Sequence, residues 1–209
     1  MKTAIQVILA VVIIGLGYGL YKSIQTPIDF ERTKDRRYDA TIQKLRDIRT
    51  AQIAYRNEHD KFTGSFDTLI DFIKEDSLNI VKATGYIPDS LLDEGMTERE
   101  ALQEGIIERD TIKVSIKDSL FEEGYDADDL WRIPSTDNDS FEMAAKIVES
   151  GGIDVPIFEA KVHNDVLLHG LDTQLVINLN EKMVEKQNKF PGLKVGDINQ
   201  PNNNAGNWE

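Results

Sequence analysis

The chain opens with an uninterrupted apolar run, and this run constrains the fold more than any other feature of the sequence. It extends from Ala4 to Tyr21, with a lysine on either side, and its strongly polar member is Gln6. As a helix the run would be about 27 Å long, close to the roughly 30 Å hydrocarbon core of a bilayer. Later apolar stretches are short and interrupted by charged residues. We therefore expect residues 1–26 to form a transmembrane anchor that holds the protein in a lipid bilayer.

A cleaved secretory signal peptide is the alternative to a retained anchor. Signal peptides have a shorter apolar region, which ends in a small-x-small cleavage site. Gly17-Tyr18-Gly19 resembles such a site poorly, and the apolar run continues past it. The chain has no cysteine, which excludes a lipid-anchored lipoprotein. A retained anchor is therefore the favoured interpretation.

Two glycines within the run have the spacing of a helix-association motif. Gly15 and Gly19 form a GxxxG pair, which can let two membrane helices approach closely. Glycine is also frequent in membrane helices in general, which is the simpler explanation of the pair. Self-association of the membrane helix is therefore a hypothesis that the spacing raises.

The protein is strongly acidic, and its charge is unevenly distributed. The 209 residues have a formal net charge of −13. Residues 61–209 contain 30 acidic and 14 basic side chains, whereas residues 31–60 contain six acidic and eight basic ones. An acidic surface repels the phosphates of nucleic acids and favours basic partners. We therefore expect no nucleic-acid partner.

The segment that follows the anchor has the pattern of a long amphipathic helix. Between residues 31 and 59, mostly apolar side chains recur every three or four positions, which places them on one stripe of a helix. Pro27 precedes this segment, where we expect it to end or kink the helix. We predict that residues 27–60 form a stalk whose stripe packs on a globular head. The stripe consists of Tyr38, Ile42, Leu45, Ile48, Gln52 and Tyr55.

Shorter patterns in residues 61–200 indicate a mixed α+β head. Ser65 and Asp172 are suitable helix N-caps, and Thr97-x-x-Glu100 is a capping box. These signals predict helices at residues 66–75, 98–104 and 173–189.

Apolar and alternating runs predict the strands of the same head. They lie at residues 78–86, 111–116, 131–134, 141–148 and 155–162. A helix is the alternative for residues 141–148. The polar tail, residues 201–209, is expected to be loose apart from Trp208.

Residues 44–73 resemble the region in which type IV pilins and type II secretion pseudopilins leave their long N-terminal helix. Within the anchor, Ile13-Ile14-Gly15 is similar to the Ile-Ile-Gly of the same family. The resemblance implies an α+β, pilin-like fold: a transmembrane helix continues into an amphipathic helix that packs on a small head with an antiparallel sheet. It also implies a periplasmic head on an inner-membrane anchor. The matching residues are Ile48, Arg49, Ala51, Gln52, Tyr55, Asn57, Lys61, Phe62 and Thr63.

The anchor also departs from the pilin pattern. In the register of the resemblance, Gln6 occupies the position of a glutamate that the family buries in the membrane, and an amide supplies no ion pair there. Met1-Lys2 stands where pilin precursors have a leader peptide, so we expect no prepilin cleavage site. We expect Gln6, Gly15 and Gly19 to be the residues at which the membrane helix would meet another subunit.

The side of the membrane on which the head lies is ambiguous in the sequence. Basic residues are more numerous after the anchor than before it, which by the positive-inside rule favours a cytoplasmic head. Acidic residues are interleaved with them, however, and a very short N-terminal tail often stays inside. The family resemblance favours the periplasm, so the two indications conflict.

Motifs for catalysis or metal binding are weak in this sequence. His163 and His169 do not form an HExxH pattern, and the sequence contains neither a Gly-x-Ser-x-Gly elbow nor a phosphate-binding glycine loop. We therefore expect a protein that is not an enzyme and has no cofactor and no metal. Calcium has weak candidate ligands in acidic runs that are more simply interpreted as a solvated face. These candidates are Asp126, Asp128, Asp137 and Asp139.

Three functional hypotheses follow from these observations. The first is a membrane-anchored structural subunit or assembly factor of a pilus-like or secretion machine, with other subunits or a second copy of the chain as partners. The second is a membrane-tethered receptor or adaptor whose acidic head binds a protein or ligand. The third is a tethered hydrolase that acts through acidic residues. The anchor and the lack of catalytic motifs favour the first.

Overall fold

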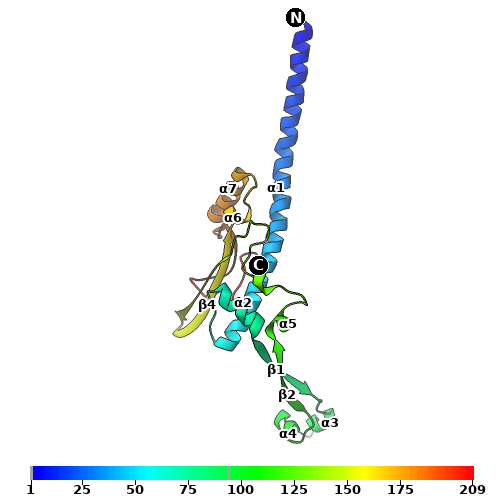
Figure 1. Ribbon diagram of the computed structural model, residues 1–209, viewed down its shortest axis with the longest axis vertical. Coiled ribbons are helices and arrows are strands. Elements are labelled where there is room, and N and C mark those ends of the chain that lie inside the picture. The colour runs from blue at the N-terminus through cyan, green and yellow to red at the C-terminus, as the bar shows by residue number, and fades with distance from the viewer. Residues whose placement is uncertain (1, 94) are drawn as a thin grey trace. The chain divides into compact units, whose positions relative to one another are not determined.

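The computed structural model describes residues 2–93 and 95–209 and has an α+β fold (Figure 1). The chain forms two compact units. The first unit consists of Met1–Phe66 and Leu130–Glu209, and the second unit is Asp67–Asp129. Each unit has its own antiparallel β-sheet.

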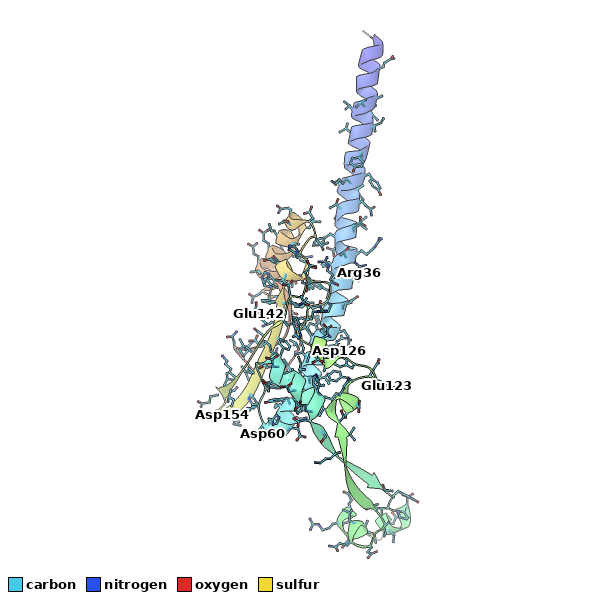
Figure 2. All side chains as sticks on the ribbon, in the orientation of Figure 1. Arg36, Asp60, Glu123, Asp126, Glu142 and Asp154 are labelled. Carbon is cyan, nitrogen blue, oxygen red and sulfur yellow. The ribbon has the colours of Figure 1, made fainter. Side chains whose placement is uncertain are left out.

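A single helix, α1 (Lys2–His59), contains both the anchor and the stalk. Pro27 lies inside it, so of the two effects expected of this residue, an end of the helix or a kink, the end is wrong. Proline removes one backbone hydrogen bond, but the turns on both sides of it remain helical, and Phe30 is buried one turn later. The helix ends where Asp60 adopts a left-handed φ of 57°, and the amide of this residue donates to the carbonyl of Arg56 at 2.8 Å. Asp60 is labelled in Figure 2.

A three-stranded antiparallel sheet forms the centre of the first unit, in the order β3-β4-β5. The prediction of a strand rather than a helix at residues 141–148 is confirmed. Gly151 and Gly152 connect β3 to β4 with φ angles of 63° and 79°, as a tight hairpin turn requires. The strands are β3 (Glu142–Ser150), β4 (Ile153–His163) and β5 (Gly192–Gly196).

The core of the first unit lies between this sheet and the second half of α1, which contacts β4 and β5. Phe158 and Ala160 of β4 are fully buried, and Val195 of β5, also fully buried, pairs with Ala160. Leu45 and Ile48 of α1 are fully buried as well. The predicted packing of a long helix on an antiparallel sheet is therefore confirmed.

Short helices connect β4 to β5. They are α6 (Asn164–Leu167), α7 (Thr173–Glu181) and a π-helical turn, η2 (Lys182–Lys186). Asp172 caps α7, because its carboxylate accepts a hydrogen bond from the amide of Leu175 at 3.1 Å. The helix predicted at 173–189 therefore begins where expected and loses its α-helical form after Glu181.

The polar tail is not loose, which corrects the expectation for residues 201–209. Asn207 donates its amide to the carbonyl of Lys194 at 3.0 Å, and its side-chain oxygen accepts from the amide of Lys194 at 3.1 Å. Its side-chain nitrogen donates to the carbonyl of Gly192 at 2.8 Å. The tail thus binds the edge of β5 that faces away from β4, because an unpaired strand edge offers donors and acceptors to any polar segment that reaches it.

Residues 131–134 do not form the predicted strand. A single bridge joins Arg132 to Ser140, and the segment between them turns back on itself. Ser135 and Asn138 have φ angles of 66° and 85° in this turn, a conformation that a strand cannot contain. The apolar character of residues 131–134 is used for burial instead, since Ile133 is almost fully buried.

The second unit is built around the antiparallel hairpin of β1 and β2, in which Ser77 pairs with Ser115. The helix predicted at 66–75 is confirmed, and so is the capping box of Thr97 and Glu100. The strand predicted at 111–116 begins earlier and ends at Ser115. The elements are α2 (Phe66–Glu75), β1 (Ser77–Thr84), α3 (Asp89–Asp93), α4 (Glu98–Gln103), β2 (Glu108–Ser115), α5 (Ile116–Leu120) and a 3-10 turn, η1 (Ala127–Asp129).

Gln52 joins the stalk to the segment that follows it. The side chain is fully buried on α1, where its oxygen accepts from the amide of Thr63 at 3.1 Å and its nitrogen donates to the carbonyl of Thr63 at 2.6 Å. The side-chain nitrogen also lies 3.2 Å from the sulfur of Met143 on β3. One amide thus satisfies both backbone groups of Thr63 as a neighbouring strand would.

Replacing Gln52 by alanine should lower the free energy of unfolding by about 2–4 kcal/mol, because it leaves two backbone groups unpaired and opens a cavity. Urea unfolding of the full chain in detergent measures this change. Gln43→Ala is the matched control, since Gln43 is exposed on the same helix and bonds Asp47 one turn away. An equal loss in both variants would contradict the role assigned to Gln52.

Candidate functional site

The first half of α1 is an apolar rod that the rest of the described chain does not cover. This helix is long and apolar enough to cross a membrane, and none of its most apolar window is buried. Ile14 is 72% exposed. The exposed apolar side chains of the rod are Leu9, Val11, Val12, Ile13, Ile14, Leu16, Tyr18, Leu20, Tyr21, Ile24 and Ile28.

Such a rod is costly to hold in water. Transferring one large apolar side chain of this exposure into an apolar phase is worth about 1 kcal/mol, so the whole set amounts to something on the order of 10 kcal/mol. Exposed apolar surface of this extent marks a contact with a membrane or with another protein. The rod is therefore compatible with the predicted anchor.

The predicted self-association residues lie open on this rod. A Cβ atom built on Gly15 or on Gly19 would have no neighbour within 4 Å. Gln6 is exposed as well. Gly15 and Gly19 are four residues apart, so they share one face of the helix and leave a shallow strip to which a second helix could come close.

The predicted stalk stripe lies against the head along its length. Leu45, Ile48, Gln52 and Tyr55 are buried, and Tyr38 and Ile42 are half-buried. Sequence reasoning missed several members of the same stripe. Phe30 precedes the segment in which the stripe was sought, and the others, Thr41, Ala51 and Ala54, are polar or small. Thr41 tolerates complete burial because its hydroxyl donates to the carbonyl of Arg37 at 2.8 Å, and its position three residues after Tyr38 was the available signal.

Arg37 fixes the upper part of the stalk to α6. Its guanidinium donates to the carbonyl of Leu167 at 2.9 Å and to that of His169 at 3.0 Å. The last carbonyls of a helix have no partner within the helix and carry partial negative charge, so a cation is favoured there. Arg36, the neighbouring residue, is exposed and is labelled on α1 in Figure 2.

Tyr38 begins a chain of polar contacts across the same junction. Its hydroxyl donates to the side-chain oxygen of Asn164 at 2.5 Å, and Asn164 is fully buried. Asn164 donates to Asn180 at 2.8 Å, and Asn180 donates to Asp165 at 2.9 Å. Burial raises the pKa of the Tyr38 phenol to about 12, because the charged form would lose its hydration.

Arg49 fixes the lower part of the stalk to the end of the chain. Its guanidinium lies 2.6 Å from the side-chain carboxylate of Glu209. This hydrogen bond lowers the pKa of the Glu209 side chain. Among the hydrogen bonds between described residues, those of Arg37, Tyr38, Arg49 and Gln52 hold α1 to the rest of the first unit.

The calcium candidates are divided between the two units. Asp128 lies in the second unit, where it pairs with Lys74 at 3.0 Å, and Asp126 accepts a hydrogen bond from the amide of Asp128 at 3.0 Å. Asp137 and Asp139 lie in the first unit at a hollow of about 460 Å³. Within the described residues, no group of three or more His, Asp or Glu side chains is arranged to hold a metal ion.

The hollow in the first unit mixes charges of both signs. Besides Asp137 and Asp139 it is lined by Asp165, His169 and Arg37, and Arg37 is already bonded to the two carbonyls of the stalk junction. His163 does not line the hollow, but its imidazole lies 3.2 Å from the carboxylate of Asp165 and against the ring of Phe190, at a centroid distance of 5.6 Å. The acidic side chains there suit a solvated face, and the geometry assigns no reaction to the hollow.

No protein-family model, curated protein sequence or solved structure matches the chain. Three features of the chain itself bear on its function: the uncovered rod, the contacts that hold the stalk to the sheet, and the distribution of charge.

The high pKa of Tyr38 predicts a pH dependence of stability. The folded chain holds this proton up to about pH 12, whereas the unfolded chain releases it near pH 10, so stability present below pH 10 is lost as the pH rises to 12. The loss should amount to about 2–3 kcal/mol. Urea unfolding between pH 9 and pH 12, compared with Tyr38→Phe, isolates it, since this variant lacks the titrating group. Equal pH dependence of both proteins would contradict the assignment.

Proposed function

We propose that the chain is a single-pass, membrane-anchored structural subunit or assembly factor of a pilus-like or secretion machine in the bacterial envelope. It acts by docking. The rod of α1 inserts into the inner membrane, the stalk holds the sheet of the first unit near the bilayer, and the head meets other subunits in the periplasm. The observation that carries this proposal is the uncovered apolar rod at the start of α1.

The arrangement of the first unit supports the pilin-like part of the proposal. The resemblance of residues 44–73 to pilins implies a long helix whose second half packs on a small antiparallel sheet. Here the second half of α1 contacts β4 and β5 of such a sheet. Gln52 is among the residues of the resemblance and bonds Thr63, a second residue of the same set. Two residues of the resemblance, Gln52 and Thr63, thus form a contact between the stalk and the segment that follows it.

The second unit supports a docking role through its charge. Residues 67–129 contain 18 acidic and six basic side chains, a net charge of −12 out of −13 for the whole chain. Glu123 and Asp126 belong to this unit (Figure 2). A domain of such charge attracts basic partners from a distance and repels anionic ones. Within the proposal, the second unit attracts the partner, and the first unit provides the membrane anchor.

The same charge also favours the second candidate function. A membrane-tethered receptor or adaptor would use the acidic second unit to bind a basic protein or ligand, without any association of its membrane helices. The two functions differ in the role of Gly15 and Gly19. Only the assembly function requires that the glycine faces of two membrane helices meet.

The anchor is tested with a pair of exposed isoleucines. Ile14→Arg places a charge in the middle of the rod, which costs about 2.5–3.5 kcal/mol of insertion free energy. Ile147→Arg is the matched control, because Ile147 is 57% exposed on β3 and outside the rod. After carbonate extraction, the unmodified protein and the control should remain with the membranes, and Ile14→Arg should be largely lost from them. An unmodified protein found wholly in the soluble fraction would end the proposal.

Self-association is tested by cysteines in a chain that otherwise has none. Single cysteines at Gly15 and at Gly19 should form disulfide-linked dimers in membranes, because they share one helix face. A cysteine at Gly17 points to the opposite face and is the matched control. Dimers at all three positions, or at none, would contradict specific association through the glycine face and favour the adaptor.

A further inference from the structure

We infer that the end of the first unit formed by α7 and η2 lies on the surface of the bilayer, as a second membrane contact beside the anchor. This inference rests on the proposed membrane insertion of the rod. In Figure 1, α7 lies at the end of the head nearest the N-terminal half of α1, and α6 lies between α7 and β4. All these elements belong to the first unit.

The height of α7 above the bilayer follows from the segment that leads into it, which lies beside α1. Thr26, Phe30 and Thr33 line one hollow together with Gly170–Asp172, the segment that leads into α7. Phe30 is nine residues beyond Tyr21, at which the apolar run ends, so it lies about 14 Å further along the helix axis. The headgroup layer extends about 5–8 Å beyond the hydrocarbon core, and a side chain reaches about 5 Å from a helix axis. The outer face of α7 is therefore within reach of the headgroups, more so when the anchor is tilted.

The outer face of α7 and η2 has the composition of an interfacial surface. Val176 is buried, and Leu175 and Leu179 are half-buried, so this side faces the head. Ile177 is 43% exposed and Val184 is 48% exposed, although both are large and apolar. An apolar side chain flanked by polar and charged ones is stabilised where hydrocarbon and headgroups meet.

The net charge of the first unit is small enough to permit a contact with lipid headgroups, and too small to drive it. The first unit has a net charge of about −1, since the second unit carries −12 of the total of −13. Lys182 and Lys186 are exposed on η2, two positions before and after Val184, and their long side chains can extend toward lipid phosphates. Glu181 and Glu185 balance their charge. Attraction between opposite charges is thus not the driving force. The contact rests on burial of Ile177 and Val184.

The proposal is tested by a fluorophore on single cysteines in the full chain, reconstituted in vesicles whose lipids carry a quencher on the headgroup. Ile177→Cys and Val184→Cys report the proposed contact. Ile153→Cys is the matched control, because Ile153 is 68% exposed and lies beside Asp154 at the end of the β3–β4 hairpin (Figure 2). Ile13→Cys, with lipids quenched in their acyl chains, reports the anchor itself.

Quenching should be about twofold or more greater at positions 177 and 184 than at position 153, as expected for a residue at the interface. Equal quenching at the three positions, with strong quenching at position 13, would overturn this inference and leave the anchor in place. Absence of quenching at position 13 would overturn the anchor, and the surface contact with it. Two reporting positions guard against one label that disturbs the local fold.

Discussion

The packing of the second half of α1 on β4 and β5 is the contact on which the rest of the first unit depends. Leu45 and Ile48 are fully buried there, opposite strand residues that are also fully buried, such as Phe158 and Val195. Hydrophobic burial of this kind has no preferred direction, so it holds the two surfaces together without fixing their register. The register comes from polar contacts with defined geometry: Gln52 on Thr63, Arg37 on the carbonyls after α6, and Arg49 on Glu209. The sheet of the first unit is therefore positioned on the stalk by a few hydrogen bonds around an apolar seam.

The difference between apolar burial and polar contacts with defined geometry also explains what could be predicted from the sequence. Periodic burial leaves a periodic pattern, so the long helix, its stripe and the strands at β3 and β4 were found. Local chemistry also leaves a signal, as the capping box of Thr97 and the cap of Asp172 show. The fold class and the existence of the uncovered rod required no more than these two kinds of pattern.

What could not be predicted depends on segments that are distant in the sequence. β5 is only five residues long, and the polar tail joins it through Asn207, whose side chain imitates a strand partner. Ile133 is buried beside a turn rather than in a strand, because the chain turns back at Ser135 and Asn138, which take left-handed conformations. The division of the head into two units, with nearly all of the net charge in one of them, is visible only when the fold shows which residues belong together. The periodicity of the stripe identified the apolar side of the stalk but not the partners of Arg37 and Arg49.

The uninterrupted course of α1 through Pro27 has a mechanical meaning. The helix has 58 residues and is therefore about 87 Å long, and its helical form continues from one end to the other. If one end of α1 is held and the helix tilts by about 10°, the other end moves by roughly 15 Å, since the displacement grows with the length of the helix. If the rod lies in a bilayer, as proposed, a small tilt of the rod would thus become a larger movement where the stalk ends. Because α1 stays helical from the rod to the stalk, such a tilt would be carried along the helix itself.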